Sequence, residues 1–214
     1  MVQRGSTSAV SRILVAAPLL AIVFAVGLVL VSSSGTGEVE GEPPVEQRRF
    51  VSRDNSFQFK YPRSLVTCEK DTQNKDCQTY IAICDQDALA CVAYPRARYE
   101  GYTFEGAAFS VNEHPEADTE TKCLASMPPP VRKESIQGVE FQGGHDSSAA
   151  AGHGLEEDSY RAFHDGRCYE LDIRIAMSSI GGYVPGTIKE FTEKHQQEVR
   201  AYLAKVKSSF VFLK

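Results

Sequence analysis

The sequence predicts an α+β fold, in which an antiparallel sheet is flanked by helices and a long C-terminal amphipathic helix is followed by a short last strand. One transmembrane helix is expected ahead of this domain. Three observations lead to the prediction. Residues 13–31 form an apolar run without a charged residue. Segments beyond residue 49 alternate apolar and polar residues with the two-residue period of strands. Residues 186–207 instead carry apolar residues at the helical period.

The apolar run has the length of a membrane-spanning helix. At about 1.5 Å per residue, the nineteen residues from Ile13 to Val31 extend roughly 28 Å, close to the thickness of the hydrocarbon core of a bilayer. A cleavable signal peptide is the alternative, although its apolar region usually spans about 7–15 residues. Val31 and Ser33 would then be the small residues before a cut after Ser33. We expect an uncleaved anchor.

The charges around the run predict its orientation. Arg4 and Arg12 precede it, no Asp or Glu does, and the next basic residue is Arg48. Because basic residues favour the cytoplasmic side of a membrane, residues 1–12 are expected to form a short cytoplasmic tail. The protein would be a single-pass membrane protein with its C-terminal domain on the extracytoplasmic side. If the segment is cleaved, the protein would instead be secreted or periplasmic.

Composition limits the domain and its partners. Residues 32–48 are mostly Gly, Ser, Pro and Glu, which is typical of a flexible acidic linker, so the domain is expected at residues 49–214. Two of the 23 Lys and Arg residues precede the apolar run, so the rest of the chain holds 21 basic residues against 28 acidic ones. An acidic domain has no electrostatic reason to bind nucleic acid or anionic lipid. We expect membrane contact through residues 13–31, a protein partner and no nucleic acid.

The first half of the domain is expected to contain short strands. The segment from Phe57 to Tyr61 alternates apolar and polar residues and ends at Pro62. Further along the chain we expect strands at 79–84, 90–94 and 103–111, a helix that starts at 118–121 and stops before Pro128, and two short strands separated by Gln137-Gly138.

Residues 143–155, GGHDSSAAAGHGL, contain the only cluster of histidines with neighbouring carboxylates. The simplest interpretation is a mobile loop, because Gly, Ala and Ser dominate it. The alternative is a site for a divalent metal ion, with His145, Asp146 and His153 as the candidate ligands, since imidazole and carboxylate groups suit such ions.

The next segment is predicted to be a hairpin around Asp165-Gly166, the dipeptide preferred in two-residue type I′ turns. This turn places His164 opposite Arg167, Arg161 opposite Glu170, and Glu157 opposite Arg174. One face of the hairpin is then apolar: Tyr160, Ala162, Tyr169, Leu171, Ile173 and Ile175. The other face carries the charge pairs, and this agreement supports the register.

The helix expected at 186–207 has a continuous apolar stripe. Its members are Ile188, Phe191, Val199, Tyr202, Leu203 and Val206, with His195 between Phe191 and Val199. A last strand is expected at Ser209–Leu213.

The six cysteines all follow the apolar run, and an exported domain makes three disulfides the expected state. No C-x-x-C pair is present, which disfavours zinc. Cys84 and Cys91 flank one hairpin turn, and Cys68 and Cys77 bracket a polar loop, which leaves Cys123 for Cys168. Cys168 lies on the polar face of its hairpin, so the helix that carries Cys123 is expected to cover that face.

Motifs of common enzyme classes are missing from the sequence, including G-x-S-x-G, H-E-x-x-H and the glycine-rich nucleotide loops. We therefore predict no catalytic residue and no cofactor. A secreted hydrolase is kept as an alternative, because triad partners meet only in the fold. It would require a Ser or Thr beside His114, His164 or His195, with a carboxylate to orient the ring.

The order of the predicted elements resembles the PsbP-like α/β/α sandwich, found in thylakoid-lumen photosystem proteins and in many bacterial exported proteins. The resemblance rests on Phe57–Pro62 and Tyr160–Leu213, and the six-cysteine middle departs from it. It implies a fold used mainly for binding and assembly. We therefore expect a membrane-tethered binding or assembly module without catalytic activity. The alternatives are a metal-binding protein that uses His145 and His153, and the hydrolase.

Overall fold

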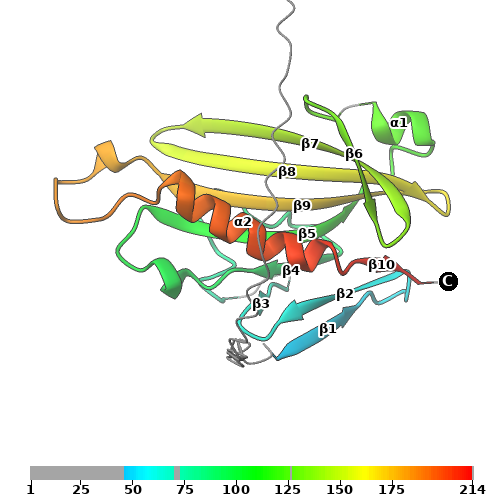
Figure 1. The fold of residues 1–214 in the computed structure, drawn as a ribbon, viewed down its shortest axis with the longest axis horizontal. Helices are drawn as coiled ribbons and strands as arrows, with labels where there is room; N and C mark the ends of the chain where they lie inside the picture. Colours follow the sequence, from blue (N-terminus) through cyan, green and yellow to red (C-terminus); the bar gives the residue numbers. More distant parts are fainter. Residues whose placement is uncertain (1–45, 70–72, 126, 214) are drawn as a thin grey trace, which may run out of the picture. The chain divides into compact units, whose positions relative to one another are not determined.

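The structure is a computed structural model that describes residues 46–69, 73–125 and 127–213 (Figure 1). All of them belong to one compact unit, Pro43–Lys214. The segment expected to be a membrane anchor, residues 13–31, lies outside the described residues. In the described part of the chain, no helix is long and apolar enough to cross a membrane.

The ten strands of the described residues form two antiparallel sheets. One sheet has three strands in the order β1-β2-β10, and the other has seven in the order β3-β4-β5-β9-β8-β7-β6. The strands are β1 (Gln47–Val51), β2 (Phe57–Pro62), β3 (Val66–Thr67), β4 (Ala90–Ala93), β5 (Phe104–Glu113), β6 (Arg132–Ile136), β7 (Val139–Ala150), β8 (His153–His164), β9 (Arg167–Ser178) and β10 (Val211–Phe212). The helices are η1 (Arg96–Tyr99), α1 (Glu120–Leu124), η2 (Ile180–Gly182) and α2 (Glu193–Lys207).

Three tight turns build the meander of strands β6 to β9. Both central residues have positive φ in Gln137-Gly138 (49° and 86°), Ala151-Gly152 (52° and 83°) and Asp165-Gly166 (48° and 77°), as type I′ turns require. The expected hairpin around Asp165-Gly166 is confirmed, and every predicted pair occurs, from His164 opposite Arg167 to Glu157 opposite Arg174. The turn at Gln137-Gly138 is confirmed as well.

The expectation of a mobile loop at residues 143–155 is wrong. These residues form the end of β7, the Ala151-Gly152 turn and the start of β8, and each of the two strands is 12 residues long. Close packing explains the glycines at positions 143 and 144. Gly143 lies under the ring of Tyr160, and Gly144 lies under Pro128, so that neither position has room for a side chain. Close contact between strand and neighbour, not chain flexibility, accounts for the glycines at the two positions.

The substitution Gly144→Ala is therefore expected to lower the free energy of unfolding by about 1–3 kcal/mol, the usual range for overpacking. A Cβ atom at this position would meet the carbonyl oxygen of Pro128 and would lie 2.8 Å from its Cγ. Gly154→Ala is the matched control on β8, where the nearest atom, Met177 Cγ, is 3.6 Å away. Urea unfolding of both variants tests this, and equal stability losses would contradict the packing explanation.

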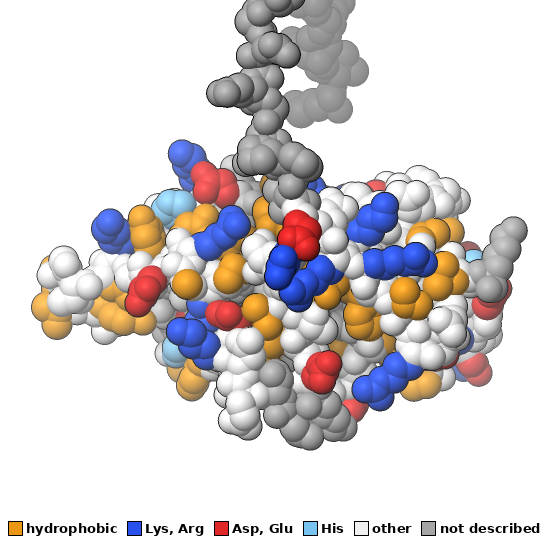
Figure 2. All heavy atoms as spheres, turned by 90° about the horizontal axis from the view of Figure 1, so that it is seen from below, with side chains coloured by type: hydrophobic (Ala, Val, Ile, Leu, Met, Phe, Trp, Pro, Cys, Tyr) orange, Lys and Arg blue, Asp and Glu red, His pale blue; other side chains and the backbone are white. Residues whose placement is uncertain are grey.

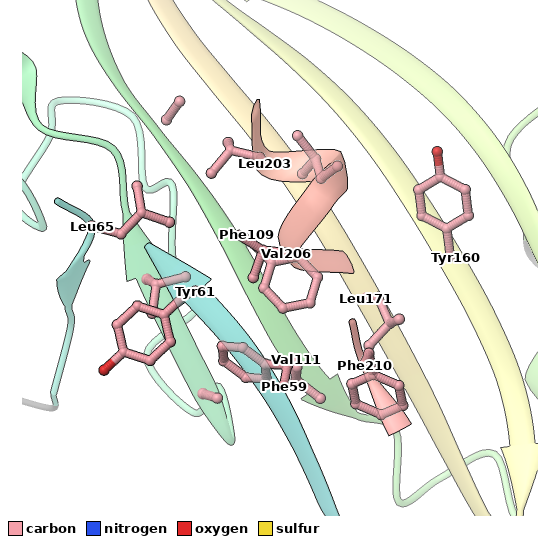
Figure 3. Packing of buried hydrophobic residues seen from close by; sticks show 14 of the residues in the cluster. Phe59, Tyr61, Leu65, Phe109, Val111, Tyr160, Leu171, Leu203, Val206 and Phe210 are labelled. Atoms are coloured by element: carbon pink, nitrogen blue, oxygen red, sulfur yellow. The ribbon is translucent and has the colours of Figure 1, made fainter. Parts of the chain in front are cut away.

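The main core lies between α2, the three-stranded sheet and one face of the seven-stranded sheet (Figure 3). Leu203 and Val206 of α2 point toward Phe109 of β5 and Leu171 of β9, and Phe59 of β2 closes the layer. The predicted apolar face of the hairpin is buried here, so this part of the prediction is confirmed.

Helix α2 begins seven residues later than expected, at Glu193 instead of 186. The Thr192 side chain caps it, and His195, at the third helical position, completes the capping box by accepting a hydrogen bond from the Thr192 N–H at 3.1 Å. Ile188 and Phe191 thus precede the helix, although Phe191 is still buried and donates its N–H to Thr103 Oγ1. The last strand is shorter than expected, Val211–Phe212.

The strand expected at 79–84 is also wrong, because both sides of β4, its expected hairpin partner, are occupied by other strands. Strand β4 already pairs with β3 on one side and β5 on the other. The segment instead runs without regular structure across the second face of the seven-stranded sheet, where Ile83 is fully buried against Cys91, Ala93, Ala108 and Ala176.

All three predicted disulfides are confirmed: Cys68–Cys77, Cys84–Cys91 and Cys123–Cys168. The first two hold the irregular segment beside β4. The third joins α1 to β9, and α1 contacts β8 and β9, so the helix that carries Cys123 covers the polar face of the hairpin as expected.

Candidate functional site

The candidate site is a groove of about 450 Å³ at one end of the seven-stranded sheet. Three segments form its walls: the β7–β8 turn with its flanks (Ala149–Gly154), the chain that leaves β9 (Met177–Ile180), and the start of α2 (Glu190–Gln196). The type I′ turn at Ala151-Gly152 and the late start of α2 are therefore what shape the groove.

The polar groups of the groove are largely engaged within the protein. Thr103 Oγ1 accepts the hydrogen bond from the N–H of Phe191, and Ser178 Oγ lies 2.9 Å from the hydroxyl of Tyr183. Glu193 accepts a hydrogen bond from Gln197 at 3.1 Å. Between these groups lie the apolar side chains of Met177 and Phe191. The groove thus offers shape and apolar surface more than reactive groups.

Exposed hydrophobic side chains lie together in the loop that leaves β9 beside the groove, and we call them the apolar rim: Ile180, which lines the groove, Tyr183 and Val184. Val184 is 71% exposed, and the hydroxyl of Tyr183 contacts Ser178 of the groove. Tyr80, which is 76% exposed, stacks on His153 on the face of the sheet away from α2, with the ring centres 4.1 Å apart. Soluble domains seldom expose contiguous apolar surface unless it contacts a partner.

The structure separates the two histidines proposed as metal ligands. Strand β7 pairs His145 with Asp158 and Ala150 with His153. Because side chains alternate between the faces of a strand, His145 and His153 lie on opposite faces of the sheet. Asp146 shares the face of His153 but lies about 13 Å away along the strand. The three candidate ligands do not form one site.

Each of these histidines has carboxylate partners of its own. His145 Nδ1 lies 3.0 Å from Asp158 and its Nε2 lies 3.1 Å from Glu156. His153 Nδ1 lies 2.5 Å from Glu105. In the described residues, the potential metal ligands that come close together are Cys68, Cys84 and Cys91, and all three sulfurs are in disulfides.

The histidines named for the hydrolase alternative have other surroundings. His114 lies between the carboxylates of Glu116 and Glu170, at 3.2 and 3.4 Å. His164 stacks on Phe212. His195 contacts the hydroxyl of Thr192, but as a helix cap. Among the described residues, none of the three histidines contacts both a hydroxyl and an orienting carboxylate.

The second face of the seven-stranded sheet holds a buried charge network, which contains the predicted pairs Arg161–Glu170 and Glu157–Arg174 and, in addition, Asp172, which was not predicted. Asp172 on β9 is fully buried and accepts a hydrogen bond from Asn112 Nδ2 at 2.7 Å. Arg174 lies 3.8 Å away. Burial, followed by the charge of Glu170, raises the pKa of Asp172 to about 8.

Glu170, the neighbour of Asp172 in this network, is held in its charged form. Burial alone would raise its pKa, but the hydrogen bond from His114 and the charge of Arg161 outweigh burial and lower it. The signal in the sequence was the run Glu170, Asp172, Arg174 on the face that also carries the buried Cys168. This network lies away from the residues that line the groove.

No protein-family model matches the chain, and no curated protein sequence matches it. Among solved structures, its fold is similar to the solution structure of cyanobacterial PsbP (CyanoP) from Synechocystis sp. PCC 6803, with a TM-score of 0.44, 9% identity, and coverage of 83% of this chain and 99% of that chain. The PsbP-like resemblance of the fold is thus supported.

Two other solved structures are similar. One is a protein of Bacteroides thetaiotaomicron VPI-5482, with a TM-score of 0.42, 12% identity, and coverage of 78% of this chain and 48% of that chain. The other is LpqN of Mycobacterium tuberculosis, which is involved in cell envelope biogenesis, with a TM-score of 0.41, 6% identity, and coverage of 79% and 91%. These similarities concern the fold.

Proposed function

We propose that this protein is a membrane-tethered binding or assembly module, and that the groove with its apolar rim binds an apolar segment of a partner protein. The observation that carries the proposal is the position of the rim. Of the seven large hydrophobic side chains exposed in the described residues, three lie in the one loop that contributes Ile180 to the groove. Apolar surface gathered in this way is typical of protein interaction sites.

The internal pairing of the polar groups supports a binding role in preference to chemistry. Thr103 and Ser178 already hold neighbouring backbone and side chains in place, so a ligand would gain mainly by covering Met177 and the rim. Tyr183 supplies a large rigid surface at low entropic cost, as residues that dominate interfaces commonly do.

The compartment is part of the same proposal. Residues 13–31 would anchor the chain, and the domain would lie on the extracytoplasmic side of the membrane. Three disulfides within the described residues support an oxidising compartment for the domain.

A photoreactive amino acid in place of Val184 is expected to give a discrete crosslinked product with the partner, in native membranes that contain the full-length protein. The additional substitution Tyr183→Asp is expected to reduce the yield about tenfold, because a charge within the rim opposes burial of an apolar segment. Product yield is measured on denaturing gels at matched protein levels.

The matched control is the same photoreactive residue at Val131, which is 52% exposed and does not line the groove. Equal crosslinking from positions 131 and 184, or a product that Tyr183→Asp leaves unchanged, would rule out the groove as the binding site.

A further inference from the structure

The outer face of the three-stranded sheet carries basic side chains among apolar ones. We call this surface the basic face: Arg49, Val51, Lys60, Val211 and Leu213, with Arg53 in the turn after β1. Phe57, Phe59 and Tyr61 point the other way, into the core. Figure 2 shows the molecule from the side of β1 and β2, where Lys and Arg side chains lie among hydrophobic ones.

The charges of the basic face are unusual for an antiparallel pair. Strand register places Arg49 directly opposite Lys60. Like charges in this position destabilise a sheet, whereas most surfaces pair opposite charges. Within the described residues, Arg49, Arg53 and Lys60 form no ion pair with a carboxylate. Positively charged side chains that lie together without a negative partner attract an anion from outside the protein.

The position of the basic face along the chain indicates which anion is near. Strand β1 starts at Gln47, and the apolar run expected to be the anchor ends at Val31. With the flexible linker expected between them, the root-mean-square extension would be roughly 20 Å. The face at the start of the domain is therefore within reach of the headgroups of the membrane that holds the anchor.

We propose that the basic face docks on anionic phospholipid headgroups, with Arg49, Arg53 and Lys60 at the phosphates and Val51, Val211 and Leu213 against the headgroup boundary. This inference rests on the proposed membrane tether. The net negative charge of the whole domain does not oppose it, because screening limits the influence of distant charges to about 8 Å in physiological salt. Docking would also fix the direction in which the groove is presented to its partner.

The test uses a single tryptophan, since the chain contains none. The full-length Val51→Trp variant is reconstituted into phosphatidylcholine vesicles with or without phosphatidylglycerol, and shallow brominated lipids serve as quenchers. We expect quenching of Trp fluorescence only in the anionic vesicles, and less of it at high salt. Adding Arg49→Glu and Lys60→Glu should weaken docking at least 25-fold, at about fivefold for each charge near an anionic surface.

Two controls match this design. Val131→Trp places the reporter at another exposed valine. Lys194→Glu with Lys205→Glu changes the net charge equally, but on exposed positions of α2. Neither control should reproduce the effect. Equal quenching in neutral vesicles, or quenching that survives reversal of Arg49 and Lys60, would overturn the proposal.

Further outcomes distinguish a failure of the proposed tether from a failure of the proposed docking. Protein that does not float with neutral vesicles would overturn the tether itself. Protein that floats with both vesicles but is quenched in neither would overturn only the docking. If quenching then appears after Glu38, Glu40 and Glu42 are changed to Gln, the acidic linker occupies the basic face and the lipid proposal is wrong.

Discussion

Removal of the Cys123–Cys168 disulfide is expected to lower the free energy of unfolding by about 4 kcal/mol, the largest loss from any of the three bonds. The bond joins residues 45 positions apart, and a cross-link that closes a longer loop removes more entropy from the unfolded chain. Both sulfurs are buried, so the double variant Cys123→Ala/Cys168→Ala avoids a free thiol in the core. For a domain of this size, the melting temperature should fall by roughly 8–16 °C.

The double variant Cys84→Ala/Cys91→Ala provides the comparison. That bond closes a separation of 7 residues, for which the same reasoning gives about 2.5 kcal/mol. Thermal unfolding of both double variants, followed by circular dichroism, measures the difference. If loss of Cys84–Cys91 destabilises the domain as much or more, loop length is not what determines the contribution of these bonds.

The substitution Asp172→Asn is expected to stabilise the domain increasingly as the pH rises from 5 to 8. The pKa of Asp172 is raised from 3.8 in the unfolded chain to about 8 in the fold, chiefly by burial. Between these values the folded state holds a proton that the unfolded state releases, so wild-type stability falls as the pH rises, by up to about 1.4 kcal/mol per pH unit. Asparagine has the same shape and does not titrate.

Urea unfolding at pH 5, 6, 7 and 8 gives the difference in stability between the variant and the wild type. This difference should grow to several kcal/mol near pH 8. Asp146→Asn is the control on β7, because Asp146 is exposed and accepts a hydrogen bond from the N–H of Ser147. A constant difference between Asp172→Asn and wild type across this range would mean that Asp172 is charged in the fold at pH 5.

The sequence predicted the structure best where independent signals agreed. In the hairpin around Asp165-Gly166, turn type, charge pairs and apolar segregation all required the same register, and that register is present. The disulfides followed from loop geometry and elimination. The hairpin depends on residues that are close together in the sequence. The disulfides depend on only six cysteines, which leaves few possible pairings.

The failures occurred where tertiary packing decided the structure. Gly, Ala and Ser have low strand propensity, so the β7–β8 hairpin was interpreted as a loop, although its long pairing with β9 makes it regular. The groove could not be predicted, because it combines segments from 103 to 196 that meet only in the fold. Tyr80 was assigned to a strand, whereas it lies in an irregular segment and stacks on His153, a contact that arises only in the fold.

Because strand β10 belongs to the three-stranded sheet, this sheet can be completed only late in synthesis. Its residues Val211 and Phe212 pair with Gln58 and Phe57, so the first strands of the domain and its last strand complete one sheet. The meander from β6 to β9 needs only local pairing and can form while the chain is still emerging. The edge of β2 stays open until Val211 and Phe212 have been synthesised. A chain that stops before residue 209 would retain that open edge, which is a template for pairing with other chains.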